Sequence, residues 1–313
     1  MSELVETRFA YGDALLELGS QRKDVVALDA DLYKSTRTVV FRDAFPDRFF
    51  DMGISEADMV STAAGMAAQG LIPFCNSFAM FITGVCYMPI RTQICYPKLP
   101  VKLVGSSAGL TQGPDGASHQ SLEDIALMRV LPNMMVLSPA DDLETMQCTY
   151  AAVDYPGPVY LRVGRYPVPR LHKNDFSFKP GKAEIMREGS DVVIFSTGIM
   201  VWKSLEAADL LAQRHISARV VNLCTIKPLD EQGIFQAAEG VDLAVTVEEH
   251  SILGGLGGAV AECLSQKAGM PALLRLGVRD TFGESGLADQ LLEKHGLQPG
   301  GIVKSITDGL SRK

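Results

Sequence analysis

Apolar runs and amphipathic segments alternate along the chain, and this pattern predicts strands and helices in regular succession. In the first half, short apolar runs bounded by Gly, Pro or Asp predict strands at 24–31, 49–54, 72–78, 101–107, 134–138 and 158–164. Segments with helical spacing predict helices at 7–19, 56–70, 80–95 and 138–153. The last of these is expected to open with Ser138 as its N-cap and Pro139 at the first helical position.

A break in the pattern divides the chain into two parts. Residues 166–182 hold three prolines and show no periodicity, which predicts a linker. A second alternating series follows, with strands DVVIFSTG, ARVVNLC, DLAVTVEEH and ALLRLGV separated by helical segments. We therefore expect an α/β protein with two domains, 1–165 and 183–313. Each is predicted to be a mostly parallel sheet covered by helices on both faces.

One segment of the first part is unusual because it carries no charge. From Met59 to Ile90 there is no Asp, Glu, Lys or Arg. A run of this length raises the possibility of a membrane span. However, it is interrupted at Gly70 and Pro73, and its first part is rich in small residues. These breaks favour a buried helix, strand and second helix that belong to a core, a subunit interface or a ligand cleft.

Composition narrows the possible functions. The net charge is −8 without a basic run, which argues against a nucleic-acid partner. The six cysteines lack CxxC or zinc spacing, so we expect buried thiols in a reducing compartment. The first residues, MSELVETRFAYGD, lack the features of a signal peptide and favour a cytoplasmic location. The stretch EEHSILGGLGGAV is not a GxGxxG match, and we expect a helix N-terminus packed against a strand there.

Polar segments follow several predicted strands of the first domain. These segments are DADLYKS, GISE and GPDGASHQ, and ligands of parallel sheets gather where strands end. Glu56 is the carboxylate at the head of the uncharged helix, which suits acid–base chemistry in a dry pocket. The alternative is a surface glutamate stabilised by the helix dipole. His119, in a loop of Gly, Asp and Ser, is a second candidate for proton transfer.

Longer segments around these residues resemble a known family. GISEADMVSTAAGMAAQG, FCNSFAMF, DGASHQSLEDIALMRVLPNMMVLSPAD and GPVYLRVGR together resemble the pyrimidine-binding domain of transketolases. IKPLD and EEHSILGGLGGAV resemble the transketolase C-terminal domain. The DG-x-x-HQ element is the most specific of these motifs. The resemblance covers nearly the whole chain and implies a thiamine diphosphate enzyme that transfers a two-carbon ketol unit between sugars.

The resemblance implies a role for individual residues at the cofactor. Glu56 matches the glutamate that hydrogen-bonds N1′ of the aminopyrimidine ring and promotes its imino form. Phe81 corresponds to the aromatic that stacks on this ring, and Phe78 to a preceding aromatic. Asp31 and Leu32 match residues that line the cofactor cleft. For the phenylalanines the alternative is an ordinary core position, and Asp31 could instead cap a turn.

The resemblance also implies substrate contacts. His119 matches the histidine that faces the substrate, and Asp115 matches an aspartate that binds a donor hydroxyl group or, alternatively, a turn residue. Positions matching those at the phosphate end are Arg8 and Ser35, together with either Arg162 or Arg165. Two positions depart from the family pattern. Gly84 replaces a third aromatic, and Ser107 stands where many transketolases have a histidine, which leaves the substrate open.

The GDG…N element that holds magnesium and diphosphate in the family does not occur in the sequence. The chain therefore resembles the smaller subunit of a transketolase encoded by two genes. This implies a partner subunit of N-terminal type that binds Mg²⁺ (or Ca²⁺), with no metal site expected here, and pairing with a second copy through 59–90. Alternatives are a 2-oxoacid dehydrogenase β subunit, a deoxyxylulose-phosphate-synthase-like enzyme and a non-catalytic scaffolding subunit.

Overall fold

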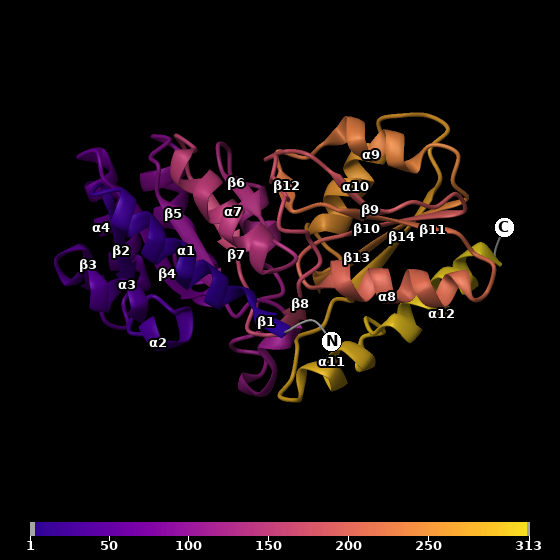
Figure 1. Ribbon diagram of the computed structural model, residues 1–313, viewed down its shortest axis with the longest axis horizontal. Coiled ribbons are helices and arrows are strands. Elements are labelled where there is room, and N and C mark those ends of the chain that lie inside the picture. Colours follow the sequence, from indigo (N-terminus) through magenta and orange to yellow (C-terminus); the bar gives the residue numbers. More distant parts are fainter. Residues whose placement is uncertain (1–3, 312–313) are drawn as a thin grey trace.

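The computed structural model describes residues 4–311, which form two main sheets lying side by side with helices around them (Figure 1). Positions 1–3 and 312–313 of the predicted domains lie outside this range. The first sheet has the strand order β12-β6-β7-β5-β4-β2-β3 and is parallel except for β12. Its strands are β2 (Val25–Asp29), β3 (Phe49–Asp51), β4 (Ile72–Phe78), β5 (Lys102–Ser106), β6 (Met135–Leu137), β7 (Val159–Arg162) and β12 (Thr225–Lys227).

Helices cover both faces of this sheet because alternate strand residues are apolar on each side. In β2, Val25 and Ala27 join the core cluster of α1 and α7, whereas Val26 and Leu28 join the cluster of α4. The helical elements are α1 (Thr7–Gln21), α2 (Tyr33–Thr36), α3 (Val39–Ala44), η1 (Pro46–Arg48), α4 (Glu56–Ala68), η2 (Phe81–Val85), α5 (Tyr87–Pro89), η3 (Ile90–Cys95), η4 (Leu110–Asp115), α6 (Asp124–Arg129) and α7 (Asp142–Asp154).

The second sheet repeats this plan with the order β14-β13-β10-β11-β9, and only β9 is antiparallel. Its strands are β9 (Glu184–Arg187), β10 (Val192–Ser196), β11 (Ala218–Asn222), β13 (Leu243–Ser251) and β14 (Ala272–Val278). The surrounding helices are α8 (Met200–Ala212), α9 (Glu231–Ala238), α10 (Leu256–Leu264), α11 (Ala288–Lys294) and α12 (Pro299–Leu310). The predicted fold class, two mostly parallel sheets each flanked by helices, is confirmed.

Two short pairings connect distant parts of the chain. β12, from the second predicted domain, adds to the edge of the first sheet by pairing antiparallel with β6. β1 (Leu4–Glu6) pairs with β8 (Pro167–Pro169), which lies inside the predicted linker. Figure 1 shows β1, β8 and β12 between the two main sheets. The second part of the chain therefore completes the first sheet.

The uncharged segment is divided as predicted. It comprises α4, then β4, then a helical stretch of η2 and α5, and η2 and η3 have π-helical hydrogen bonding. No helix within residues 4–311 is long and apolar enough to cross a membrane. All six cysteines are buried free thiols, in agreement with the expectation.

The predicted start of the helix at Ser138 is wrong. Ser138 instead donates its backbone N–H to the carbonyl of Cys224 at 2.8 Å, in the second part of the chain. The helix α7 begins four residues later, where the Asp141 side chain accepts a hydrogen bond from Glu144 N at 2.9 Å. A contact between distant segments thus holds Ser138 in extended backbone, and Asp141 is the N-cap.

The glycine-rich stretch forms a helix N-terminus packed on a strand, as expected. The buried carboxylate of Glu248 in β13 accepts hydrogen bonds from Leu256 N at 2.7 Å and Gly257 N at 2.8 Å. This carboxylate caps the first turn of α10. Glycine is needed at Gly255 because a Cβ atom there would lie 2.2 Å from Glu248 Oε2.

Candidate active site

The predicted polar segments come together at one edge of the first sheet, namely the edge formed by the carboxyl ends of its parallel strands. β2, β4 and β5 are neighbours in parallel register, so the loops that follow them lie side by side. Asp31 and Leu32 follow β2, Phe81 lies in η2 just after β4, and Ser107 follows β5. The loop after β5 continues into η4 and ends near His119. This edge is the candidate active site.

Glu56 is the first residue of α4 and is nearly buried, with 8% of its surface exposed. Its Oε1 accepts a hydrogen bond from Ser77 Oγ of β4 at 3.1 Å. The helix N-terminus favours the negative charge, and the next turn of α4 contributes Met59 and Val60 to the apolar core. Glu56 therefore presents a carboxylate with a fixed orientation at the sheet edge.

Two phenylalanines and a histidine form a ring cluster beside this edge. Phe78 ends β4 and Phe81 opens η2, and their rings stack at 6.0 Å with an angle of 24°. His119, from a loop about forty residues away, packs edge-on against Phe81 at 5.1 Å and Phe78 at 6.0 Å. Its Nδ1 lies 3.0 Å from Ser118 Oγ. The structure thus brings together three residues identified separately in the sequence.

Gly84 lies beside the end of a neighbouring side chain. A Cβ atom at this position would lie 2.6 Å from Cε of Met80. Because residues four apart share a helix face, the Met80 side chain already covers the space beside Gly84. A larger side chain at this position would therefore have to displace the terminal methyl group of Met80.

The Asp31 loop is organised by Asp29, which the sequence reasoning did not single out. Asp29 accepts hydrogen bonds from Leu32 N at 2.6 Å, Thr36 Oγ1 at 2.7 Å and Thr38 Oγ1 at 2.8 Å. Burial raises the pKa of Asp29 to about 6, although these hydrogen bonds act in the opposite direction and lower it. Asp31 adopts the left-handed conformation with φ of 60°. The sequence signal for Asp29 was its own position as the first residue of DADL, directly at the end of the strand.

Arg8 and Ser35, distant in sequence, are brought into contact. Arg8 Nη1 donates to the Ser35 carbonyl at 2.9 Å, and Arg8 also pairs with Glu6. Arg37 lies over the ring of Phe9, with its guanidinium carbon 4.0 Å from the ring centroid. Sequence reasoning missed Arg37, which adds a second cation beside Arg8.

The two alternative arginines differ in accessibility. The side chain of Arg165 is half-exposed, and its Nη1 lies 3.4 Å from Asp115 Oδ2. This oxygen also accepts a hydrogen bond from Gln112. Arg162 is buried, with its Nε 2.8 Å from Asp124 and its Nη1 3.6 Å from Glu249. Two carboxylates therefore occupy Arg162 in the interior, and Arg165 is the more accessible of the two arginines.

The end of β5 leaves two hydroxyl groups without partners. Ser106 and Ser107 are both buried, and neither Oγ atom has a hydrogen-bond partner in the described structure. Ser107 also adopts φ of 55°, a conformation that costs a non-glycine residue free energy. Buried polar atoms are nearly always satisfied in proteins, so these two hydroxyls at the strand end are candidates for contact with a polar ligand.

Comparison with known proteins gives a consistent picture. Residues 3–169 match the family "Transketolase, pyrimidine binding domain", and residues 181–302 match "Transketolase, C-terminal domain". The chain is 44% identical to the "Putative transketolase C-terminal section" of Methanocaldococcus jannaschii, over 98% of this chain and 96% of that protein. It is 42% identical to the "6-deoxy-6-sulfo-D-fructose transketolase subunit SqwH" of a Clostridium species, over 98% and 95% of the two chains.

The similarity extends to a solved structure. It is described as "Split gene transketolase, inactive beta4 tetramer" and is 46% identical, with a TM-score of 0.91 over 98% of this chain and 99% of that one. The two domain matches together cover most of the chain, and the curated relatives align over almost their full length. The chain therefore belongs to the transketolase family, of which it comprises the pyrimidine-binding and C-terminal domains.

Proposed function

We propose that this chain is the pyrimidine-binding subunit of a split transketolase, which transfers a two-carbon ketol unit from a ketose to an aldose. Transketolases use thiamine diphosphate, and the site fits this cofactor. A nearly buried carboxylate, two stacked phenylalanine rings and two unpartnered serine hydroxyls lie at one sheet edge. The observation that carries the proposal is Glu56, held by Ser77 at the edge that also bears Phe81 and His119.

Each residue has a role in this proposal. The bound cofactor supplies a nucleophilic carbon that takes up the two-carbon unit. Glu56 holds and exchanges a proton at N1′ of the pyrimidine, which its dry surroundings favour. Phe81 and Phe78 stack against and flank the pyrimidine, and Asp31 and Leu32 line the cleft.

The site is completed by other chains. We infer that a subunit of transketolase N-terminal type binds the diphosphate group and Mg²⁺ (or Ca²⁺). The name of the archaeal relative, a C-terminal section, and the split-gene structure support this. A second copy of this chain pairs through 59–90, where Val85 and Met88 are each 61% exposed. Large exposed apolar side chains on one segment are typical of interfaces. The chain alone is expected to be inactive.

The test combines this chain with the candidate N-terminal subunit and measures ketol transfer in the presence of thiamine diphosphate and Mg²⁺. Glu56→Gln keeps the shape of the side chain but cannot exchange the proton. We expect turnover to fall at least about a hundredfold. Asp58→Asn, an exposed position in the same helical turn, is the matched control and should retain activity.

Two results would contradict the proposal. The first is full thiamine-diphosphate-dependent turnover by this chain without a partner. The second is a Glu56→Gln complex within a few-fold of the unmodified complex, at equal assembly by sedimentation. Formation of products from pyruvate instead of a ketose donor would favour a deoxyxylulose-phosphate-synthase-like reaction.

The substrate-binding residues are proposed on the same edge. His119 hydrogen-bonds the sugar hydroxyls and carbonyl and moves protons there. Asp115 binds a donor hydroxyl. Arg8, Ser35 and Arg165 bind the terminal anion, because each of them is at least partly exposed, whereas Arg162 is buried.

Ser107 bears on substrate choice. Serine donates one hydrogen bond but cannot become cationic, whereas a histidine at this place can. A hydrogen bond to a charged group contributes about 1.5–3 kcal/mol, which corresponds to roughly tenfold or more in preference. One relative is named for a sulfo sugar, so the terminal anion varies among similar proteins. We infer at least one substrate that differs from the common pentose phosphates in its terminal anion, or lacks one.

A substrate panel on the reconstituted complex tests this inference. The unmodified complex is compared with Ser107→His and, as a small-residue control, Ser107→Ala. We expect Ser107→His to shift kcat/KM towards phosphorylated pentoses. The inference is wrong if the unmodified complex already prefers xylulose and ribose phosphates and Ser107→His changes neither rate nor KM.

A further inference from the structure

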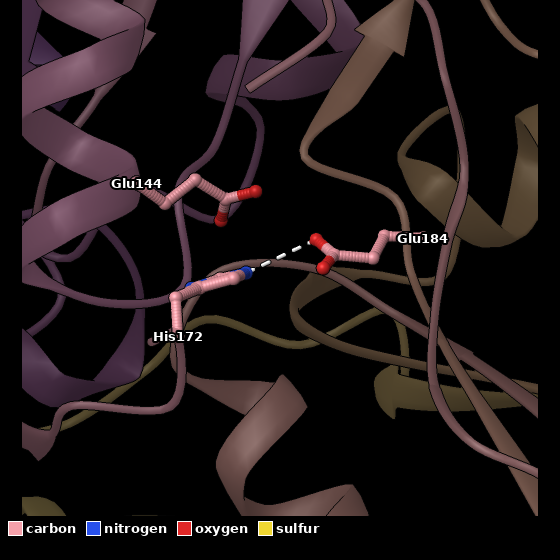
Figure 2. Close-up of side chains that lie close together, drawn as sticks. All are labelled: Glu144, His172 and Glu184. Carbon is pink, nitrogen blue, oxygen red and sulfur yellow. Dashed lines mark hydrogen bonds and ion pairs between the residues drawn. The ribbon is translucent and has the colours of Figure 1, made fainter. Parts of the chain in front are cut away.

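We propose that Glu144, His172 and Glu184 bind a divalent transition-metal ion between the two main sheets. Glu144 lies in α7, His172 in the connecting segment and Glu184 in β9. Figure 2 shows the three side chains pointing toward one another from these separate segments. One ligand atom from each lies within 4.8 Å of the others, and His172 Nε2 is 3.1 Å from Glu184 Oε2.

The histidine is oriented as a metal ligand requires. His172 Nδ1 lies 2.9 Å from Asp141 Oδ2, and the backbone N–H of His172 donates to the same oxygen at 2.8 Å. A proton on Nδ1 that bonds to Asp141 leaves the lone pair of Nε2 directed at Glu184. Histidines that bind metals usually donate their other N–H to a carboxylate or carbonyl in this way, which fixes both the tautomer and the ring.

Glu144 is also held by neighbouring groups. Its Oε2 accepts a hydrogen bond from Ala140 N at 2.7 Å, and its Oε1 accepts one from Asn222 Nδ2 at 2.8 Å. A carboxylate has about four lone-pair sites, so both oxygens retain capacity for a cation. These contacts fix the side chain without satisfying it fully.

Asn222 gives independent support. It ends β11, is 1% exposed, and its Oδ1 has no hydrogen-bond partner in the described structure. Reversing the amide would place two oxygens in contact at Glu144, so the observed orientation is the favourable one. Glu144, Glu184 and Asn222 line a common cavity of about 410 Å³. Asn222 contacts Glu144 and is paired with Glu184 in the register of β11 and β9, so its unpartnered oxygen is a further donor near the cluster.

The donor types select the ion. One imidazole nitrogen with carboxylate and amide oxygens suits Zn²⁺, Mn²⁺ or Co²⁺, and lacks the thiolates that soft ions prefer. Donors around Zn²⁺ lie roughly 3.3 Å apart, so binding would close the widest separation by at most roughly 1.5 Å. The competing occupant is a proton on His172, which would then donate to both Asp141 and Glu184. The metal site joins α7 to β9 and would hold the two sheets in a fixed orientation.

The experiment uses the full chain, treated with chelator and then titrated with Zn²⁺ by calorimetry, with metal content measured after dialysis. Glu184→Gln removes a ligand at a 40%-exposed side chain, and His172→Gln removes the nitrogen. Glu188→Gln, near the same strand and 76% exposed, is the matched control. We expect one Zn²⁺ per chain in the unmodified protein and in Glu188→Gln, with a raised Tm. Either ligand variant should bind at least about tenfold more weakly.

Co²⁺ in place of Zn²⁺ provides a second measurement, since its visible absorption reports the coordination of nitrogen and oxygen ligands directly. The proposal is overturned if the unmodified chain takes up no Zn²⁺ beyond the buffer level. It is also overturned if uptake is the same in Glu184→Gln, which would place the ion elsewhere, for example at cysteines. Should His172→Gln fail to fold, Glu184→Gln alone decides the outcome.

Discussion

The hydroxyl of Ser77 holds the Glu56 carboxylate against the end of β4. Ser77 is the next-to-last residue of the strand β4 and is fully buried, so a hydroxyl there requires a partner. It donates to Glu56 Oε1 at 3.1 Å across the gap between strand and helix. We therefore regard Ser77 as a positioning residue that acts through Glu56.

Replacing Ser77 tests this role in the reconstituted complex. Ser77→Ala loses a hydrogen bond to a charged group, about 1.5–3 kcal/mol, so kcat should fall roughly ten- to hundredfold with KM for the sugar little changed. Ser77→Thr retains the hydroxyl and should recover most of the activity. Steady-state kinetics at saturating cofactor give the answer. Equal activity in the alanine and threonine variants would contradict the role.

At the residue scale, short sequence motifs were sufficient to single out the main candidate residues of the site. Glu56, Phe81 and His119 stand in recognisable segments, and the structure places them at one edge. Asp29 and Ser77 were not predicted as site residues, because their importance comes from contacts that only the folded chain makes. The difference in accessibility between Arg162 and Arg165 likewise depends on burial, which the sequence alone does not reveal.

At the scale of elements, a buried lysine joins β5 to the end of α7. Lys102 is 1% exposed, and its Nζ donates to the carbonyls of Tyr155 at 2.7 Å and Gly157 at 2.9 Å. Burial lowers the pKa of Lys102 to about 7, although Asp154 nearby opposes the shift. The strand therefore begins with a side chain that ties down the loop after the helix.

This lysine predicts a pH dependence of stability. Its pKa is about 7 in the folded chain and 10.5 when unperturbed, so the unfolded chain binds more protons between these values. Its contribution to the free energy of unfolding should thus rise with pH from about 7 to 10 and stay constant below 7. Urea denaturation at pH 6.5 and 9.5 should show a gain on the order of 2–3 kcal/mol that Lys102→Met lacks.

The exposed Lys304→Met is the control and should retain the gain. If the unmodified chain and Lys102→Met respond equally to pH, another group is responsible.

The elements themselves were largely predictable, and the exceptions share one cause. Regular apolar runs predicted the parallel strands. The short strands β1, β8, β9 and β12 were missed because each is stabilised by pairing with a distant segment. The same applies to Ser138, which long-range backbone pairing removes from the helix. The π-helical bonding of η2 and η3 leaves no clear trace in hydrophobic spacing.

At the scale of the molecule, a buried ionic cluster connects the two sheets. Arg162 of β7 contacts Asp124 of α6 and Glu249 of β13, and Tyr160 donates to Asp124 at 2.7 Å. Burial opposes the charge on the guanidinium, but Asp124 and Glu249 outweigh this and raise the pKa of Arg162. Arg162 is therefore needed as a cation in the interior.

Removal of this cation should be costly. Arg162→Met leaves two buried carboxylates without their partner, and we expect the free energy of unfolding to fall by about 3–5 kcal/mol. Arg165→Met, at the half-exposed neighbour, should change it by less than about 0.5 kcal/mol. Chemical denaturation measures both. Adding Asp124→Asn to Arg162→Met should recover part of the loss, and similar values for the two single variants would contradict the assignment.

The strand β12 has a consequence for how this protein can be divided or recombined. Cutting the chain at residue 165 would remove β12, one of the two neighbours of β6, and leave β6 as an open sheet edge, which invites self-association. Lys227 strengthens the link through hydrogen bonds from its Nζ to the carbonyls of Arg129 and Leu131. A chimera that exchanges the second half between relatives must therefore bring a strand that fits the recipient's β6. The place at which the two halves can be recombined is therefore set by this strand pairing and not by the boundary between the two domains.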